Sequence, residues 1–364
     1  MARPETTALR RGWTTGACAA AAARAAFQAL LTGRFPDPVT IRLPRGQTPK
    51  FPLALAEQSD GRARAGIVKD AGDDPDVTHG ALIVAELAWA SPGSGVHFRA
   101  GEGVGTVTRA GLALAVGEPA INPAPRAMIS ETLAELAEAN GAASPDLVVT
   151  IAIPGGERLA EKTMNARLGI VGGLSVLGTT GIVVPYSCSS WIHAIQRGID
   201  VARAAGLTHI AAATGTTSER AVQRLYDLPE AALIDMGDFV GGTLKYLRRH
   251  PVPRLTLAGG FAKLAKLVQG HLDLHSSRSR LDAAALADIL AGLGADPASV
   301  AAAAEMDSAG AILELAGSRR TALAEAVARQ AREVALATLS GATAVEVAIV
   351  DRGGDFLARV GAER

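Results

Sequence analysis

The second half of the sequence alternates short apolar runs with stretches of helical character, and this alternation constrains the fold more than any other feature. The predicted strands are residues 181–184, 208–213, 232–235, 254–258 and 344–350. The predicted helices are residues 191–205, 218–225, 239–248 and 261–269, and residues 281–339 are nearly all helical. Apolar strands that alternate with helices form βαβ units, so this half predicts a Rossmann-like α/β domain with a parallel sheet.

The first half predicts an α+β domain. An alanine-rich helix is expected from Thr15 to Thr32, because alanine has the highest helix propensity and Gly33 suits its C-terminal cap. A second helix is expected at residues 125–139, and strands at residues 39–43, 51–57, 62–69, 95–99, 106–109 and 147–153. The rhythm changes after Pro154-Gly155-Gly156. We therefore expect an α/β protein of two domains, residues 1–155 and 156–364.

Composition narrows the classes of function. The 36 basic residues equal the 36 acidic ones, which argues against a nucleic-acid or anionic-membrane partner. Two cysteines are too few for a disulfide framework or a structural zinc site. No secretory signal and no apolar run of about 18 residues is present, so we expect a soluble, cytoplasmic protein. The sequence leaves open whether the protein forms a homo-oligomer.

Three predicted strands of the second half end in turns rich in glycine and small polar residues. Ligands bind outside the carboxyl ends of strands in open parallel sheets, and glycine lets the backbone approach them closely. The alternative is that these are only tight turns between strand and helix. Neither a phosphate-binding loop nor a GxGxxG turn after a strand occurs. Classical NAD and ATP chemistry is therefore less favoured, and a nucleoside cofactor such as S-adenosylmethionine remains possible. The cofactor-binding candidates are Thr214, Gly215, Thr216, Asp235, Gly237, Gly241, Gly259 and Gly260.

Residues 70–80 form the densest polar cluster in the chain. Its four carboxylates are able to bind Mg²⁺ or Ca²⁺, or to position a general base beside His79. Equally, the cluster is a solvated acidic turn, because Asp, Gly and Pro are ordinary turn formers. No metal site is assigned to it.

Two further segments are able to meet an anionic ligand. Thr15 is expected to cap the alanine-rich helix, whose first-turn N–H groups would then form an anion site together with Thr14 and Gly16. Lys263 and Lys266 follow the third glycine-rich turn. In each case the alternative is structural: a well-capped helix, or solvated charges on a helix face. Cys18 reads as a small buried residue and not as a nucleophile.

Taken in order, these segments resemble the cobalt-precorrin-5B (C1)-methyltransferase family of cobalamin biosynthesis. The resemblance rests on residues 11–20 (RGWTTGACAA), 69–78 (KDAGDDPDVT), 101–108 (GEGVGTVT), 117–123 (GEPAINP) and 162–183 (KTMNARLGIVGGLSVLGTTGIV). Trp13 stands where the family has Tyr or Phe, and residues 259–263 lack the glycine that the family has before Lys263. No motif matches beyond residue 276.

The resemblance implies transfer of a methyl group from S-adenosylmethionine to C1 of a cobalt-containing tetrapyrrole, with cobalt present only in the substrate. Methylation of a cobalt-free precorrin, or a non-catalytic tetrapyrrole carrier, are the alternatives. Because the substrate carries many carboxylates, the resemblance gives Thr14, Thr15, Gly16, Lys263 and Lys266 a substrate-binding role. Catalytic candidates for acid–base chemistry are Asp70, Asp73, Asp74 and His79. The first domain is then the substrate side and the second the S-adenosylmethionine side.

Overall fold

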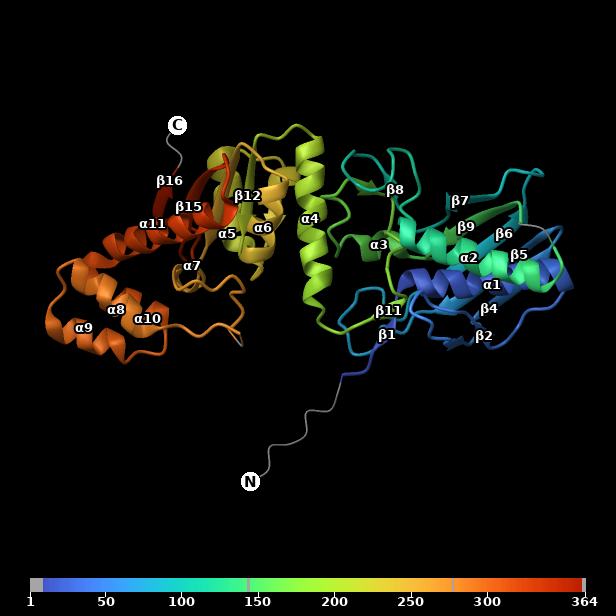
Figure 1. Cartoon of the computed structure of the whole chain (residues 1–364), viewed down its shortest axis with the longest axis horizontal. Coiled ribbons are helices and arrows are strands. Elements are labelled where there is room, and N and C mark those ends of the chain that lie inside the picture. Colours follow the sequence, from blue (N-terminus) through green and yellow to red (C-terminus); the bar gives the residue numbers. More distant parts are fainter. Residues whose placement is uncertain (1–8, 143–144, 277, 362–364) are drawn as a thin grey trace, which may run out of the picture. The chain divides into compact units, whose positions relative to one another are not determined.

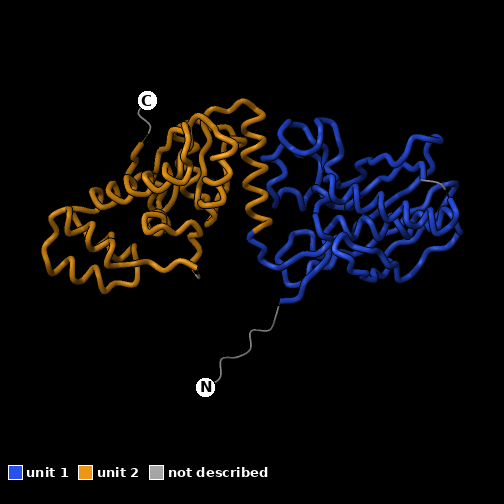
Figure 2. Tube along the Cα trace, in the orientation of Figure 1, with its two compact units in different colours: residues 1–188 blue, residues 189–364 orange. Residues whose placement is uncertain are grey.

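The computed structural model describes residues 9–142, 145–276 and 278–361, and the chain divides into two compact units, residues 1–188 and 189–364 (Figures 1 and 2). The division falls after Cys188 and not near residue 155. The reason is that the intervening segment pairs with the first unit: strand β10 (Ile170–Val171) with β8 (Thr106–Val107), and β11 (Ile182–Val183) with β1 (Gly12–Trp13). Residues 181–184 are therefore no part of the second sheet. Among the described residues, no helix is long and apolar enough to cross a membrane.

Unit 1 is built on a five-stranded sheet with the order β4-β5-β6-β9-β7. Its strands are β4 (Leu55–Ser59), β5 (Arg62–Val68), β6 (Leu82–Trp89), β7 (Val96–Ala100) and β9 (Leu147–Ala152). Neighbouring strands are antiparallel except β7, which runs parallel to β9. The central strand β6 is absent from the strands expected above, whereas the other four were predicted to within a few residues.

Helix α1 (Thr15–Thr32) is the centre of the core of unit 1. It packs on β5, β6 and helix α2 (Pro123–Ala139), and residues 17–23 are fully buried. A helix buried on all sides needs small apolar side chains all round, and the alanine run supplies them. Gly33 ends the helix in the left-handed conformation, as predicted. The shorter elements of this unit are β2 (Val39–Thr40), β3 (Lys50–Phe51) and α3 (Gly156–Ala160).

Unit 2 contains a five-stranded sheet with the order β13-β12-β14-β15-β16. Strands β12 (His209–Ala213), β13 (Leu233–Asp235), β14 (Arg254–Gly259) and β15 (Ala344–Val350) are parallel, whereas the edge strand β16 (Phe356–Gly361) is antiparallel to β15. The parallel part of the sheet agrees with the prediction. The unit as a whole is α/β with a sheet of mixed orientation, because the unpredicted β16 returns along β15.

Helices cover both faces of this sheet. Ile210 and Ala212 of β12 lie in one apolar cluster with helices α4 (Cys188–Ala204), α6 (Val240–Arg249), α7 (Phe261–Val268) and α11 (Arg320–Leu339). Ala211 and Ala213 face the other way, in a cluster that includes Val222 of α5 (Thr216–Tyr226). The remaining elements of unit 2 are the 3₁₀ turns Glu230–Ala232 and Gly317–Arg319, and helices α8 (Ala283–Gly292), α9 (Pro297–Ala304) and α10 (Ala309–Leu315).

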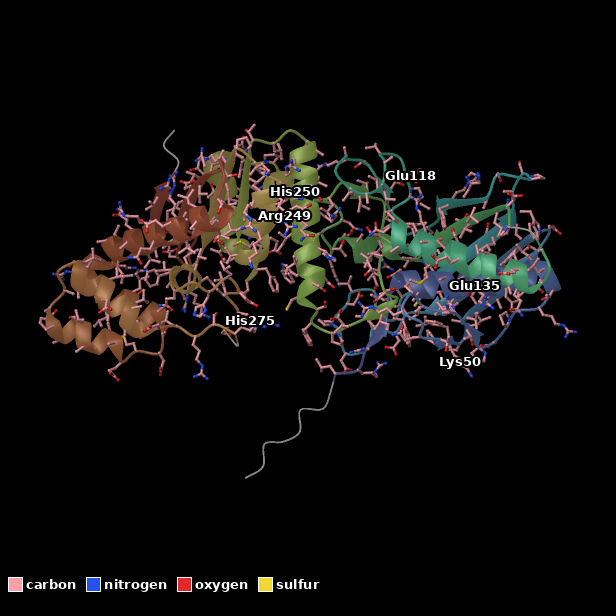
Figure 3. The ribbon with its side chains drawn as sticks, in the orientation of Figure 1. Lys50, Glu118, Glu135, Arg249, His250 and His275 are labelled. Atoms are coloured by element: carbon pink, nitrogen blue, oxygen red, sulfur yellow. The ribbon has the colours of Figure 1, made fainter. Side chains whose placement is uncertain are left out.

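Side chains project from the helices and strands, among them His250 at the end of α6 (Figure 3). The His250 ring stacks on Tyr246 with ring centres 4.3 Å apart.

Near the amino end of β15, the buried Glu346 carboxylate accepts hydrogen bonds from Tyr226, Thr256 and Arg359. Burial alone would raise the pKa of Glu346, but these hydrogen bonds outweigh it and lower the pKa. Glu346 is therefore a buried, ionised anchor of the sheet.

Candidate active site

In unit 2, the chain adds strands to the sheet first on one side of β12 and then on the other side. From β12 the chain crosses α5 to reach β13 on one side, and then returns to β14 on the other side of β12. The helices that follow β12 and β14, α5 and α7, consequently lie in clusters on opposite faces of the sheet. The gap between two such connections, outside the carboxyl ends of the strands, is the usual ligand site of open α/β sheets.

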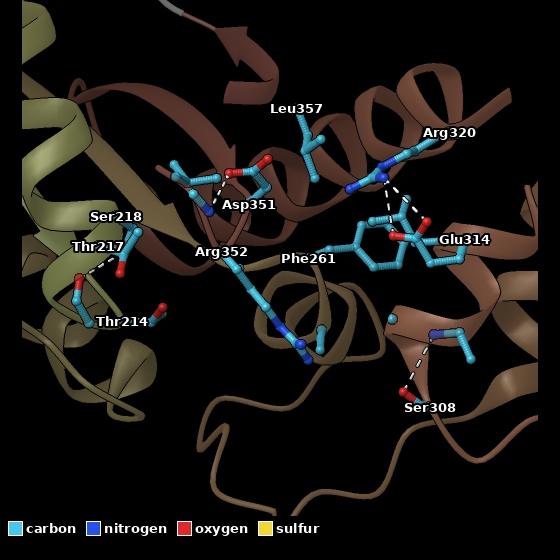
Figure 4. Close-up of a pocket in the computed structure, with 18 of the residues that line it drawn as sticks. Thr214, Thr217, Ser218, Phe261, Ser308, Glu314, Arg320, Asp351, Arg352 and Leu357 are labelled. Atoms are coloured by element: carbon cyan, nitrogen blue, oxygen red, sulfur yellow. Dashed lines mark hydrogen bonds and ion pairs between the residues drawn. The ribbon is translucent and has the colours of Figure 1, made fainter. Parts of the chain in front are cut away.

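A cavity of about 660 Å³ lies at this point, and we call it the switch-point cavity (Figure 4). Its walls are residues 214–218 after β12, residues 260–262 after β14, residues 350–353 after β15, part of the segment 308–314, Arg320 and Leu357. Four of the predicted cofactor residues line it: Thr214, Gly215, Thr216 and Gly260. The volume is in the range of pockets that bind small molecules and cofactors.

Two helix N-termini open onto this cavity without a side-chain cap. Helix α5 follows Gly215 and α7 follows Gly260, and neither glycine position provides a capping hydrogen bond. In α5, the hydroxyl of Ser218 donates to the Gly215 carbonyl at 2.9 Å. The first N–H groups of a helix have no intrahelical acceptor, so they are available to carboxylate or hydroxyl oxygens of a ligand.

The glycines of the predicted turns fall into two groups. A Cβ atom built on Gly215 would meet no atom within 4 Å, and one on Gly260 would approach only the Val350 carbonyl at 4.0 Å. A Cβ on Gly259 would lie 2.8 Å from Thr214 Oγ1, and one on Gly241 would lie 2.6 Å from Leu272. The first group is therefore open to the cavity, whereas the second is required for packing.

The turn after β13 is filled by a tryptophan. The indole Nε1 of Trp191 donates to the Asp235 carbonyl at 3.2 Å, and the indole lies 3.4 Å from a Cβ position on Gly237. Gly237 also has a φ of +54°, which favours glycine. The second of the three predicted turns is thus held by protein contacts, and none of its residues lines the cavity.

Several residues of the cavity were missed from the sequence. Asp351, Arg352 and Gly353 follow the apolar strand β15, so they show the same pattern of polar residues and glycine that marked the other turns. The Asp351 carboxylate accepts the amide N–H groups of Gly353 and Asp355 at 2.8 and 2.9 Å, which holds the turn closed. Glu314 and Arg320 come from the helical tail, where no local signal distinguishes them.

Lys263 and Lys266, predicted to bind substrate, make internal contacts. The Lys263 ammonium pairs with Asp238, and Lys266 Nζ donates to the Leu274 carbonyl at 3.2 Å. Burial, and then the charge of Lys263, lower the pKa of Lys266. Neither lysine lines the switch-point cavity. Their role in substrate binding stays a prediction.

In unit 1, the loop of residues 70–80, which we call the acidic loop, forms hydrogen bonds to two distant segments of the chain. Asp70 pairs with Arg10, with Nη2 donating to Oδ1 at 2.9 Å, and the Asp73 carboxylate accepts the Arg10 amide at 2.6 Å. The Asp74 carboxylate accepts the Tyr186 amide at 2.8 Å. The hydrogen bond from Arg10 is the main reason that the pKa of Asp70 falls to about 2. Asp70 is thus ionised near neutral pH and poorly suited to proton transfer.

His79 differs from these carboxylates. Its Nδ1 accepts the Ala71 amide at 3.1 Å, and its side chain is 53% exposed. A neutral imidazole that accepts at Nδ1 carries its proton on Nε2, so Nε2 is able to exchange a proton with solvent or a ligand. Of the four catalytic candidates, His79 therefore retains the clearest chemical capacity.

A buried cation that sequence reasoning missed borders this loop. Lys69 is only 2% exposed, and its ammonium contacts the Asp76 carboxylate and the Thr78 hydroxyl. These contacts hold the loop from inside. The position is hard to find from sequence, because a lysine that borders an acidic turn is usually solvated.

The start of α1 is capped by Thr14 and not by Thr15. Thr14 Oγ1 accepts the Ala17 amide at 3.2 Å, and the Gly16 amide donates to the Leu177 carbonyl at 3.0 Å. Thr15 is 2% exposed, and a Cβ on Gly16 would lie 2.9 Å from Pro125. These contacts give Thr14, Thr15 and Gly16 a structural role, and their binding of substrate stays a prediction.

Cys18 lies in the core of unit 1, as expected. It is fully buried, and burial raises the pKa of its thiol to about 12. A thiol that stays protonated at neutral pH is not a nucleophile.

Comparison with known proteins identifies similar sequences along both units. The family model described as CbiD matches residues 2–185, and that of the CbiD C-terminal domain matches residues 273–361, where the sequence motifs above gave no match. The cobalt-precorrin-5B C(1)-methyltransferase of Paramagnetospirillum magneticum is 61% identical over 348 residues, which are 95% of this chain and 97% of that protein. The protein of the same name from Brucella anthropi is 58% identical over 353 residues, 97% of this chain and 96% of that protein.

One solved structure is also similar. The crystal structure of the cobalamin biosynthesis protein cbiD from Archaeoglobus fulgidus is 28% identical, covers 74% of this chain and 83% of its own, and aligns with a TM-score of 0.40.

Proposed function

The chain belongs to the CbiD family, and we propose that it is an enzyme that transfers a methyl group from S-adenosylmethionine to C1 of cobalt-precorrin-5B. The proposal is supported by relatives of that name at 58–61% identity that align over nearly the whole chain. The name of these relatives contains both the reaction and the cobalt-bearing substrate, so cobalt is part of the substrate in this proposal.

The observation that carries the cofactor assignment is the switch-point cavity of unit 2. Its volume suits a nucleoside ligand, two uncapped helix N-termini face it, and Gly215 and Gly260 leave space where side chains would stand. The neighbouring strands β12 and β14 are parallel, as in nucleotide-binding α/β domains. We assign S-adenosylmethionine to this cavity, and Gly259, which packs against Thr214, to the support of its wall. Cofactor binding by Asp235, Gly237 and Gly241 stays a prediction.

The reaction requires positioning more than protein nucleophiles. The sulfonium–methyl bond breaks as the new carbon–carbon bond forms, and S-adenosylhomocysteine leaves with both electrons of the broken bond. The donor is already activated, so the main task of the protein is to hold methyl and ring carbon in line. In this proposal the turn 214–218 and the turn 260–262 hold the nucleoside, and Asp351 lies at a strand end suited to ribose hydroxyls.

Unit 1 takes the substrate side in this proposal, with His79 as the group that transfers a proton while the macrocycle reorganises. The half-exposed ring and its Nε2 proton support this choice. The ionised and paired Asp70, with Asp73 and Asp74, instead shapes the loop that carries His79.

The proposal is tested by supplying the purified chain with methyl-labelled S-adenosylmethionine and either cobalt-precorrin-5B or its cobalt-free counterpart. We expect label in the cobalt-containing product, at C1 by NMR, with one S-adenosylhomocysteine released per methyl group. Preferred methylation of the cobalt-free macrocycle would redefine the substrate. Tight binding of macrocycle without methyl transfer, and without binding of S-adenosylhomocysteine, would identify a carrier instead.

A further inference from the structure

One ion pair lies in the wall of the switch-point cavity, where a ligand is able to contact it. Glu314 belongs to α10 and Arg320 is the first residue of α11, and the two line the cavity together (Figure 4). Arg320 Nη1 lies 3.1 and 3.3 Å from the two carboxylate oxygens of Glu314. The side chains are 37% and 68% exposed, respectively, so a ligand in the cavity is able to reach both.

The hydrogen bonds of Arg320 are incomplete. Its Nε is buried and has no hydrogen-bond partner within the part of the chain that the structure describes, while Glu314 occupies only Nη1. A guanidinium carries five N–H donors in a planar fork, and its best partner is a carboxylate that accepts two of them. Nε is closed to solvent and therefore to a ligand as well. No residue in the described part of the chain bonds Nη2, and the side chain is 37% exposed, so the outer end of the guanidinium is open to an acceptor brought by a ligand.

The charges of the cavity wall are balanced. Arg320 and Arg352 stand against Glu314 and Asp351, and the Asp351 carboxylate is already engaged by two backbone amides. A polyphosphate would meet two carboxylates here and gain no net attraction from the charged side chains. A zwitterion, with a carboxylate and an ammonium on one carbon atom, matches a neighbouring arginine and glutamate directly.

We propose that Arg320 binds the carboxylate, and Glu314 the ammonium, of the amino-acid end of S-adenosylmethionine. The inference rests on the proposed cofactor site and adds an orientation to it. The amino-acid end lies against α10 and α11, and the nucleoside lies against the turns after β12 and β14. The pair thereby selects ligands that carry an α-amino acid.

Two ligands distinguish recognition of the amino-acid end from a general effect of Arg320 on the cofactor site. S-Adenosylhomocysteine and 5′-methylthioadenosine share the nucleoside and a neutral sulfur, but only the first has the amino-acid end. Calorimetric titration of the full chain should show that Arg320→Met raises the Kd for S-adenosylhomocysteine by about 10- to 150-fold, the range for a lost charge-assisted hydrogen bond. Binding of 5′-methylthioadenosine should change by less than about twofold. Glu314→Gln should show the same selectivity with a smaller loss.

Arg329→Met is the matched control, because Arg329 is an exposed arginine of the same helix α11 and does not line the cavity. It should change neither affinity. Arg320→Lys should recover part of the affinity for S-adenosylhomocysteine, since it keeps the charge but loses the planar fork.

The outcomes separate this inference from the proposed site. Equal losses for both ligands in Arg320→Met would show that Arg320 acts through the fold, and unchanged binding of both would show that it has no contact; either result overturns the inference and leaves the cofactor site in place. If the wild-type chain binds neither ligand, the cofactor site and the inference fail together.

Discussion

Gly215→Val is the substitution that most cleanly tests the cofactor site. Gly215 lines the switch-point cavity, its φ of 173° is extended backbone that any residue adopts, and a Cβ there meets no atom within 4 Å. The valine side chain should therefore occupy ligand space without displacing protein atoms. Gly241→Val is a poorer test, because its Cβ would lie 2.6 Å from Leu272 and would strain the fold.

The expected loss of affinity follows from the contacts that valine would block. A ligand kept away from this turn loses the amide donors at the start of α5, those of Thr216 and Thr217. Two hydrogen bonds at about 1–1.5 kcal/mol each give about 2–3 kcal/mol, which is about 30- to 150-fold in Kd. The stability of the unit should change by no more than about 1 kcal/mol, because the poorer cap and the stiffer unfolded chain act in opposite directions.

The assay is calorimetric titration of S-adenosylhomocysteine, accompanied by thermal unfolding. Gly341→Val is the control, since Gly341 is exposed, has ordinary backbone angles and has its nearest Cβ neighbour at 3.7 Å. We expect weak binding in Gly215→Val alone, with a Tm within about 4 °C of wild type in both variants. Wild-type affinity in a folded Gly215→Val variant would refute the placement of the cofactor.

Three further substitutions test the structural account. His79→Asn keeps an acceptor for the Ala71 amide but removes the Nε2 proton, so methyl transfer should fall about 10²-fold with unchanged S-adenosylhomocysteine affinity; full turnover would limit His79 to its backbone contact. Asp70, whose pKa of about 2 lies below that of an unfolded carboxyl, stabilises unit 1 above about pH 4 and loses this contribution as the pH falls toward 2. Because both partners of its ion pair are about half exposed, Asp70→Asn should lower the free energy of unfolding at pH 7 by no more than about 1 kcal/mol. The loss of stability of unit 1 between about pH 4 and pH 2 should become less steep in this variant, and an unchanged pH dependence would contradict this reading. Glu346→Gln should cost about 2–3 kcal/mol in urea unfolding, since it leaves two partly buried arginines without their carboxylate, and a neutral effect would mean that water replaces it.

The parallel strands of unit 2 were predictable because each is an apolar run bounded by turn residues, and β12, β13, β14 and β15 match their predicted ranges closely. Strand β6 was missed for a physical reason. Its sequence LIVAELAW lacks strict alternation, and the single charge, Glu86, is satisfied by Arg62 and Arg64 of the neighbouring strand. Such pairing across strands is invisible in a local window. The same limit explains the domain boundary, which depends on β10 and β11 pairing with strands far earlier in the chain.

The candidate site was predictable where its residues follow strands. Thr214, Gly215, Thr216 and Gly260 combine glycine with strand ends, and all four line the cavity. Glycine alone did not reveal which turns were open, because Gly241 and Gly259 serve packing against Leu272 and Thr214. That distinction depends on tertiary contacts. Glu314 and Arg320 were unpredictable for the same reason, since tertiary packing brings α10 and α11 to the strand ends.

The central claim is that the methyl donor binds between the turns after β12 and β14, and amide hydrogen exchange with and without S-adenosylhomocysteine tests it most directly. The uncapped amides at the starts of α5 and α7 have no intrahelical acceptor, so their exchange should be fast in the free protein. We predict that the ligand slows exchange in peptides covering residues 214–219 and 260–264 more than anywhere else in the chain. Slowed exchange confined to unit 1, or to the turn after β13, with these two peptides unchanged, would contradict the account.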